Sequence, residues 1–134
     1  MTEYLVVSVV SGLLFAMMDV AINANPVAQR LFAVYKPIAR QSVNPVAGAV
    51  IDLAYGFVMA GLFLLLYVSL PGATGLLKGL AYACLAWFFR VVMSAASQWV
   101  MFNIPVQTVL YSVTAGLGEM LVLGVVYGLV LTPA

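Results

Sequence analysis

Four long runs of apolar residues, separated by short polar or turn-forming stretches, dominate the chain. They cover about residues 4–24, 46–69, 76–101 and 107–130. A helix needs about 20 predominantly apolar residues to cross the hydrocarbon core of a bilayer, so each run is long enough for one span. Short second and third connections favour antiparallel neighbours. The pattern therefore predicts an all-α integral membrane protein, a single domain over residues 1–134 with four transmembrane helices in an up-down-up-down bundle.

The first connection carries a helical pattern of its own. Asn25-Pro26 and Asn44-Pro45 each join a helix-capping side chain to a proline at the first helical position. We expect a short interfacial helix between the first two spans, lying on the membrane headgroups and broken near Pro37. Its apolar positions are Val27, Leu31, Val34, Tyr35 and Ile38, and its polar positions are Gln29, Lys36 and Arg40.

Composition agrees with the membrane assignment. Hydrophobic residues make up 66% of the 134 residues and charged residues 7%, against roughly 45–50% and about 25% in soluble domains. Such a chain lacks the polar side chains for a soluble surface, which excludes a separate soluble domain. Its net charge of +1 also excludes the broad basic surface that binds nucleic acid. The lipid bilayer is the expected surrounding.

Basic residues are distributed unevenly between the connections. Arg30, Lys36 and Arg40 lie in the first connection, whereas the opposite side has only Lys78 and the amino group of the chain. Because positive charge is retained on the cytoplasmic side during insertion, we expect the first and third connections inside. Both termini are then on the outer, periplasmic side. The layout is similar to that of short bacterial inner-membrane proteins, and we expect that location.

Four charged residues, Asp19, Asp52, Arg90 and Glu119, each fall inside a different apolar run. An unpaired charge near the middle of a bilayer costs about 2.5–3.5 kcal/mol on insertion scales, so these four side chains should face inward. At 1.5 Å per residue, Asp19 and Asp52 lie about 9–10 Å from the inner ends of their helices. Arg90 and Glu119 lie about 18 Å from the inner ends of theirs. The pattern predicts a vestibule open to the cytoplasm, with a polar lining of Asn23, Ser94, Ser97, Gln98 and Ser112.

Three interpretations of these charges stay open. In the first, Arg90 pairs with Glu119 or reaches toward the aspartates, and the network sets the helix register. In the second, three carboxylates facing one arginine leave an excess of negative charge, so at least one acid holds a proton or binds a cation. In the third, one charged helix face docks onto a different protein.

Several kinds of chemistry are excluded or unsupported. The chain has no histidine and a single cysteine, Cys84, which excludes an internal disulfide, haem with histidine ligation and a cysteine-based zinc site. No nucleophile–base pair or phosphate-binding glycine loop is present. We therefore expect no catalytic activity, no cofactor and no metal.

Gly124 and Gly128 form a Gly-x-x-x-Gly motif that favours close contact between helices.

In size and helix count the chain resembles the small multidrug resistance transporters, which work as antiparallel dimers with a functional glutamate in the first helix. Here the first helix carries Asp19 and the last carries Glu119, so no residue role is carried over. We expect a non-catalytic subunit or organising element of a larger membrane complex. The alternative is a homo-oligomeric proton- or cation-coupled transporter that uses the intramembrane carboxylates.

Overall fold

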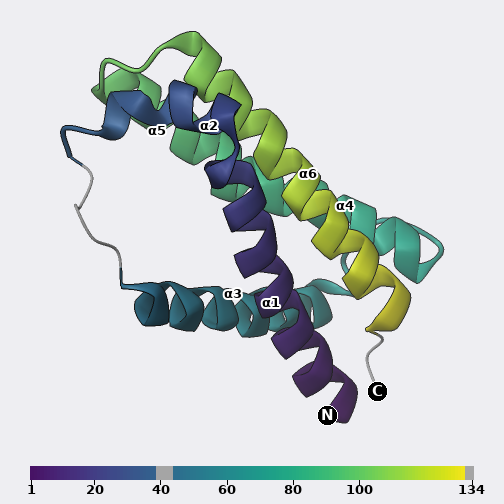
Figure 1. Ribbon diagram of the computed structural model, residues 1–134. Helices are drawn as coiled ribbons and strands as arrows, with labels where there is room; N and C mark the ends of the chain where they lie inside the picture. The colour runs from purple at the N-terminus through teal and green to yellow at the C-terminus, as the bar shows by residue number, and fades with distance from the viewer. Residues whose placement is uncertain (39–43, 132–134) are drawn as a thin grey trace.

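All regular structure in the described part of the chain is helical (Figure 1). The computed structural model describes residues 1–38 and 44–131, so the predicted polar position at Arg40 lies outside the described residues. The elements are α1 (Thr2–Ala24), α2 (Pro26–Leu31), the 3-10 turn η1 (Phe32–Tyr35), α3 (Pro45–Leu66), α4 (Gly75–Trp87), the π-helical turn η2 (Phe88–Val92), α5 (Met93–Met101) and α6 (Val106–Val130).

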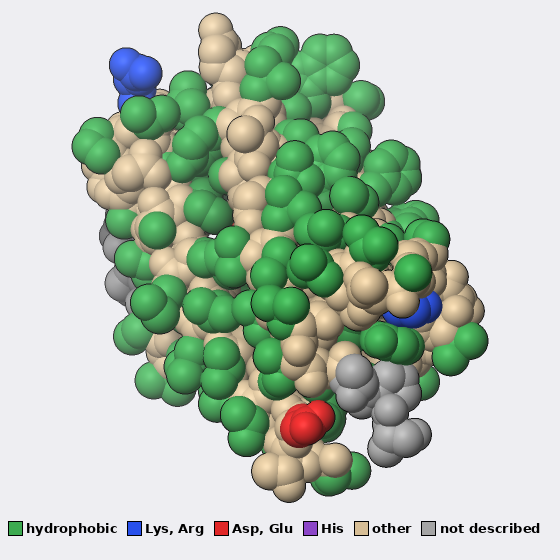
Figure 2. Space-filling model, turned by 90° about the vertical axis from the view of Figure 1, so that its right-hand side faces the viewer, with side chains coloured by type: hydrophobic (Ala, Val, Ile, Leu, Met, Phe, Trp, Pro, Cys, Tyr) green, Lys and Arg blue, Asp and Glu red, His purple; other side chains and the backbone are tan. Residues whose placement is uncertain are grey.

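Four helical stretches are long and apolar enough to cross a membrane. They are α1, α3, the continuous stretch Gly75–Met101 formed by α4, η2 and α5, and α6. Each begins and ends within three residues of the range that the apolar runs predict, which confirms the four long helices. The face seen in Figure 2 is covered by hydrophobic side chains, with only a few charged groups near its margins. These features are those of a multi-pass membrane protein.

The two predicted helix caps are confirmed. The Asn25 side-chain oxygen accepts a hydrogen bond from the Ala28 amide at 2.8 Å and begins α2. The Asn44 side-chain oxygen accepts from the Val46 amide at 3.0 Å and begins α3. In both places the following proline occupies a position where its missing N–H is not needed.

The short helix in the first connection ends near Pro37, as the sequence predicts. Regular structure ends at Tyr35, three residues before Ile38, because Pro37 has no N–H to continue the ladder and disfavours helical backbone at Lys36. The segment also packs on α6, where the Thr108 hydroxyl donates to the Leu31 carbonyl at 2.7 Å.

Glycines join the long helices into two pairs, α1 with α3 and α4 with α6. A side chain on Gly56 would collide with the backbone of Ser8 and Gly12, and one on Gly79 would collide with the Gly124 carbonyl. Gly128 lies against the start of α4 in the same way, so both glycines of the Gly-x-x-x-Gly motif contact α4 within the chain. Such close backbone approach is typical of membrane helices.

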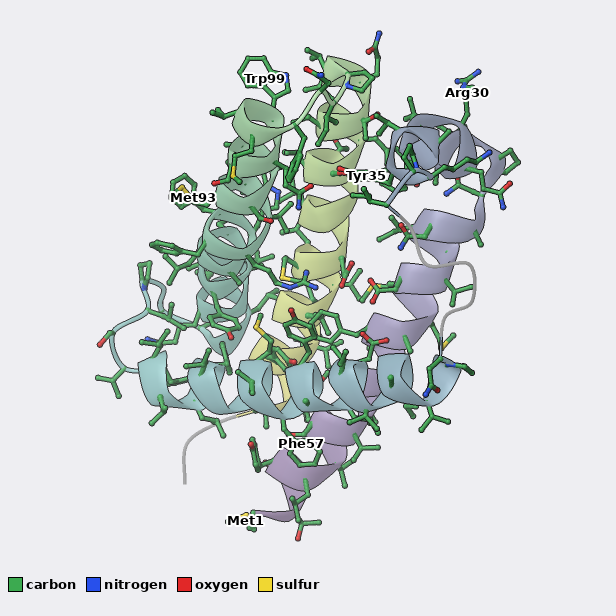
Figure 3. The ribbon with its side chains drawn as sticks, turned by 90° about the vertical axis from the view of Figure 1, so that its left-hand side faces the viewer. Met1, Arg30, Tyr35, Phe57, Met93 and Trp99 are labelled. Atoms are coloured by element: carbon green, nitrogen blue, oxygen red, sulfur yellow. The ribbon has the colours of Figure 1, made fainter. Side chains whose placement is uncertain are left out.

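Helix α3 differs from the regular bundle that the short connections predict. In Figures 1 and 3 it runs across the other long helices instead of alongside them. The backbones of α1 and α3 meet closely around Gly12 and Gly56, and a contact concentrated at small residues permits a steep crossing. The up-down-up-down order therefore stays a prediction.

An aromatic core fills the region where the two pairs meet. The ring centre of Phe63 on α3 lies 5.4 Å from that of Tyr82 on α4 and 5.8 Å from that of Tyr127 on α6. The Tyr82 hydroxyl donates to the Met59 carbonyl at 2.8 Å. Phe63 and Tyr127 are fully buried, so this layer holds both helix pairs together.

Candidate functional site

The four predicted inward-facing residues, Asp19, Asp52, Arg90 and Glu119, come together in one cluster. Arg90 of η2 and Glu119 of α6 approach each other, with 3.8 Å between Nη1 and Oε1. Asp19 of α1 lies within electrostatic range of Asp52 of α3 and of both other groups. Glu119 is only 5% exposed. Each helix pair thus contributes two members, and the charges meet at the interface between the pairs.

The π-helical turn delivers Arg90 to this interface. A π turn holds one more residue per turn than an α-helix, and such turns are frequent at functional sites. Gly116 on α6 leaves room for Val91 of the same turn, since an added Cβ at Gly116 would lie 2.6 Å from a Val91 methyl carbon. Glu119 follows Gly116 by three residues on α6 and therefore shares its face.

Aromatic rings hold the guanidinium in place. The central carbon of the Arg90 guanidinium lies 4.8 Å from the ring centre of Tyr55 and 5.4 Å from that of Phe15. Cation–π contacts of this kind offset part of the cost of removing an arginine from water. They come from α3 and α1, so the first helix pair supplies both rings.

Polar contacts within the cluster are incomplete. The 3.8 Å between Arg90 and Glu119 exceeds the range of about 2.7–3.2 Å for an N–H···O hydrogen bond. Arg90 Nε and Glu119 Oε1 are buried and have no hydrogen-bond partner among the described residues. A buried ion pair stabilises a fold only when its geometry is good and its remaining polar atoms are satisfied. The Arg90–Glu119 contact therefore lacks the geometry of a well-satisfied buried ion pair.

A polar cavity of about 330 Å³ adjoins the cluster on the side of Arg90. The Tyr35 hydroxyl donates to the Gln98 side-chain oxygen at 3.0 Å and closes one wall. Figure 3 shows Tyr35 in the space between η1 and α6. The polar side chains that line the cavity are those of Tyr35, Tyr55, Arg90, Ser94, Gln98 and Ser112.

The predicted polar lining is only partly assembled here. Ser94, Gln98 and Ser112 line this cavity. Asn23 lines a neighbouring cavity of about 770 Å³ together with Ser112, and its amide donates to the Asp19 carbonyl at 2.8 Å. Ser97 is exposed and is absent from both sets of lining residues.

Three aromatic residues of the site were not predicted from the sequence as site residues, namely Phe15, Tyr35 and Tyr55. A signal for one of them exists in the spacing. Tyr55 follows Asp52 by three residues, which puts both on one helix face. An arginine within an apolar run is stabilised by aromatic or acidic neighbours. Tyr35 gives no such signal because its contact with Gln98 joins distant segments.

Comparison of the chain with protein-family models, with curated proteins and with solved structures found no match. Within residues 1–38 and 44–131, no group of three acidic, cysteine or histidine side chains is arranged to hold a metal ion. The function proposed below therefore rests on the residues of the cluster and its cavity.

Proposed function

We propose that this protein is a small, non-catalytic transporter whose four long helices cross a bilayer and whose buried carboxylates bind and release protons or a small cation. In this proposal copies of the chain self-associate in a bacterial inner membrane, with both termini on the periplasmic side. Three of the four acidic residues of the chain, Asp19, Asp52 and Glu119, belong to the cluster.

The loose contact between Arg90 and Glu119 is the observation that supports this function best. Glu119 approaches Arg90 and lies within electrostatic range of Asp19 and Asp52, and Arg90 Nε and Glu119 Oε1 lack hydrogen-bond partners among the described residues. A buried carboxylate without a satisfying partner is stabilised by a proton or a cation. Ionisable groups inside membrane spans commonly mark such paths.

Proton flux into proteoliposomes with an internal pH-sensitive dye tests the proposal. We expect Glu119→Gln and Asp52→Asn to reduce flux at least tenfold, because each variant removes one exchangeable carboxylate from the cluster. Glu3→Gln is the matched control, since Glu3 is exposed at the start of α1 and lies outside the cluster.

Folding is followed in parallel by the temperature of unfolding. Flux that is lost while the unfolding temperature is kept supports the transporter. Unchanged flux in both cluster variants overturns it, and equal loss of folding in both favours the structural ion-pair network instead.

A subunit of a larger membrane complex is the second candidate, favoured by the first half of α3. Val46 is 68% exposed, Val50 60% and Ile51 55%, and an added Cβ at Gly48 would meet nothing within 4 Å. This half-helix therefore has few neighbours within the chain. Extraction in mild detergent and native mass spectrometry distinguish the candidates, since a stoichiometric foreign protein identifies a subunit and a homo-oligomer favours the transporter.

A further inference from the structure

The cavity beside the charge cluster offers hydrogen-bond donors. The Gln98 side-chain oxygen already accepts from the Tyr35 hydroxyl at 3.0 Å, which leaves the two N–H groups of this amide for another partner. The hydroxyls of Ser94 and Ser112 and the guanidinium of Arg90 lie on the same lining. This arrangement suits a ligand that accepts several hydrogen bonds.

The charge of the lining is positive. Arg90 contributes its guanidinium, and none of the described residues that line the cavity is acidic. Glu119 approaches Arg90 without belonging to the lining. A ligand in the cavity therefore contacts the guanidinium directly, and an anion is favoured there once Glu119 holds a proton.

The remaining lining limits the size and polarity of the ligand. Val91, Ala95, Ile104 and Val109 supply apolar surface. A volume of about 330 Å³ lies at the lower end of the range of about 300–1,000 Å³ for small-molecule sites. A short apolar chain with one charged end matches both features.

We propose that this cavity binds a small organic carboxylate through Arg90, Gln98 and the two serine hydroxyls. The inference rests on the transport function proposed above and names its substrate class. Carboxylates are planar acceptors that match the fork of donors on a guanidinium.

Ligand binding is coupled to a proton through Glu119. Three charged groups face Glu119, namely Arg90 from η2, Asp19 from α1 and Asp52 from α3. When the ligand carboxylate binds the guanidinium in place of Glu119, Glu119 lies beside Asp19 and Asp52 without a paired cation. Glu119 then takes up one proton from the buffered solution, so that one anion and one proton enter the site together.

Isothermal titration calorimetry of the protein in lipid nanodiscs tests this inference, with empty nanodiscs as the blank. The probe is butyrate, and butyramide and butylammonium are its neutral and cationic counterparts. We expect butyrate to bind at least tenfold more tightly than either counterpart, because only butyrate forms charge-assisted hydrogen bonds with Arg90. Titrations in two buffers with different ionisation enthalpies should show the uptake of about one proton per butyrate.

Variants separate butyrate binding at the cavity from proton uptake by Glu119. Arg90→Gln removes the cation and should weaken butyrate binding at least tenfold. Gln98→Glu adds a carboxylate to the lining at an exposed position and should also weaken butyrate binding at least tenfold. The second variant keeps the carboxylate site testable even if Arg90→Gln fails to fold. Glu119→Gln should keep or tighten butyrate binding and abolish proton uptake. Arg30→Gln, which removes an exposed cation from α2, should change neither.

Equal binding of butyrate and butyramide, or unchanged butyrate binding in Gln98→Glu, overturns the carboxylate site. Proton flux that depends on Glu119 in a protein that does not bind butyrate overturns this site alone and keeps the proposed transport function. Butyrate binding without proton flux that depends on Glu119 and Asp52 keeps this site and overturns the proposed transport function.

Discussion

At the scale of single residues, glycine decides how closely the helices of this protein approach. Gly79 and Gly124 face each other across α4 and α6, and an added Cβ on Gly124 would lie 2.7 Å from the Cβ of Ala83. The neighbouring atoms are largely backbone, which cannot move aside as a flexible side chain can. Gly118, on the same helix, would meet nothing within 4 Å.

The glycine contact yields a prediction about stability. Gly79→Ala should lower the free energy of unfolding by about 1–3 kcal/mol through overpacking against α6. Gly118→Ala is the matched control and should cause no loss, because alanine is a better helix former by up to about 1 kcal/mol. Denaturation in mixed detergent micelles measures both. Equal effects of the two substitutions would show that the α4–α6 contact does not depend on Gly79.

At the scale of elements, the π-helical turn η2 is the segment that links the fold to the candidate site. It interrupts an otherwise continuous span between α4 and α5 and carries Arg90. An α-helical backbone through the same residues would turn Arg90 about 100° around the helix axis for each residue of offset. The guanidinium would then leave the rings of Phe15 and Tyr55.

Deletion of Phe89 tests this role, since Phe89 is 65% exposed and its loss removes the extra residue of the turn. We expect helical content and unfolding temperature to be kept, because regular α-helical hydrogen bonding replaces the turn. Proton flux should fall at least tenfold, because Arg90 is rotated away from Glu119. The substitution Phe89→Ala keeps the turn and should leave flux unchanged. A deletion variant with normal flux would contradict a positioning role for η2.

At the scale of the whole molecule, the direction of α3 is the feature that the proposed membrane topology depends on. Arg30 and Trp99 lie at one end of the protein and Met1 at the other (Figure 3), as expected for helices that cross a bilayer. Helix α3 runs across this direction. The proposed topology requires that the two ends of α3 lie on opposite sides of the membrane.

Cysteine labelling tests the topology in a Cys84→Ser background, which removes the single native cysteine. Ala47→Cys lies in the first turn of α3 and Ser69→Cys lies three residues beyond its last residue, and both positions are exposed. A membrane-impermeant maleimide added to the periplasmic side should label Ser69→Cys and should label Ala47→Cys only after permeabilisation. Labelling of both from the same side would show that α3 lies along one membrane face.

The sequence by itself determined the features that depend on neighbours along the chain. Apolar runs of sufficient length predict the four long helices, and Asn25-Pro26 and Asn44-Pro45 predict their own helix starts, because capping involves amides only two or three residues away. The position of Asp19, Asp52, Arg90 and Glu119 inside the apolar runs also indicates that they face inward, since lipid penalises exposed charge.

Only the tertiary structure decided the features that depend on which residues meet across helices. The crossing of α3 follows from the contact between Gly12 and Gly56, which lie 44 positions apart in the chain, and periodicity within one helix carries no information about that partner. Similarly, the rings beside Arg90 and the wall formed by Tyr35 and Gln98 join distant segments. Hydropathy indicates which segments suit an apolar environment, whereas the geometry of a polar site depends on the distance and angle between helices.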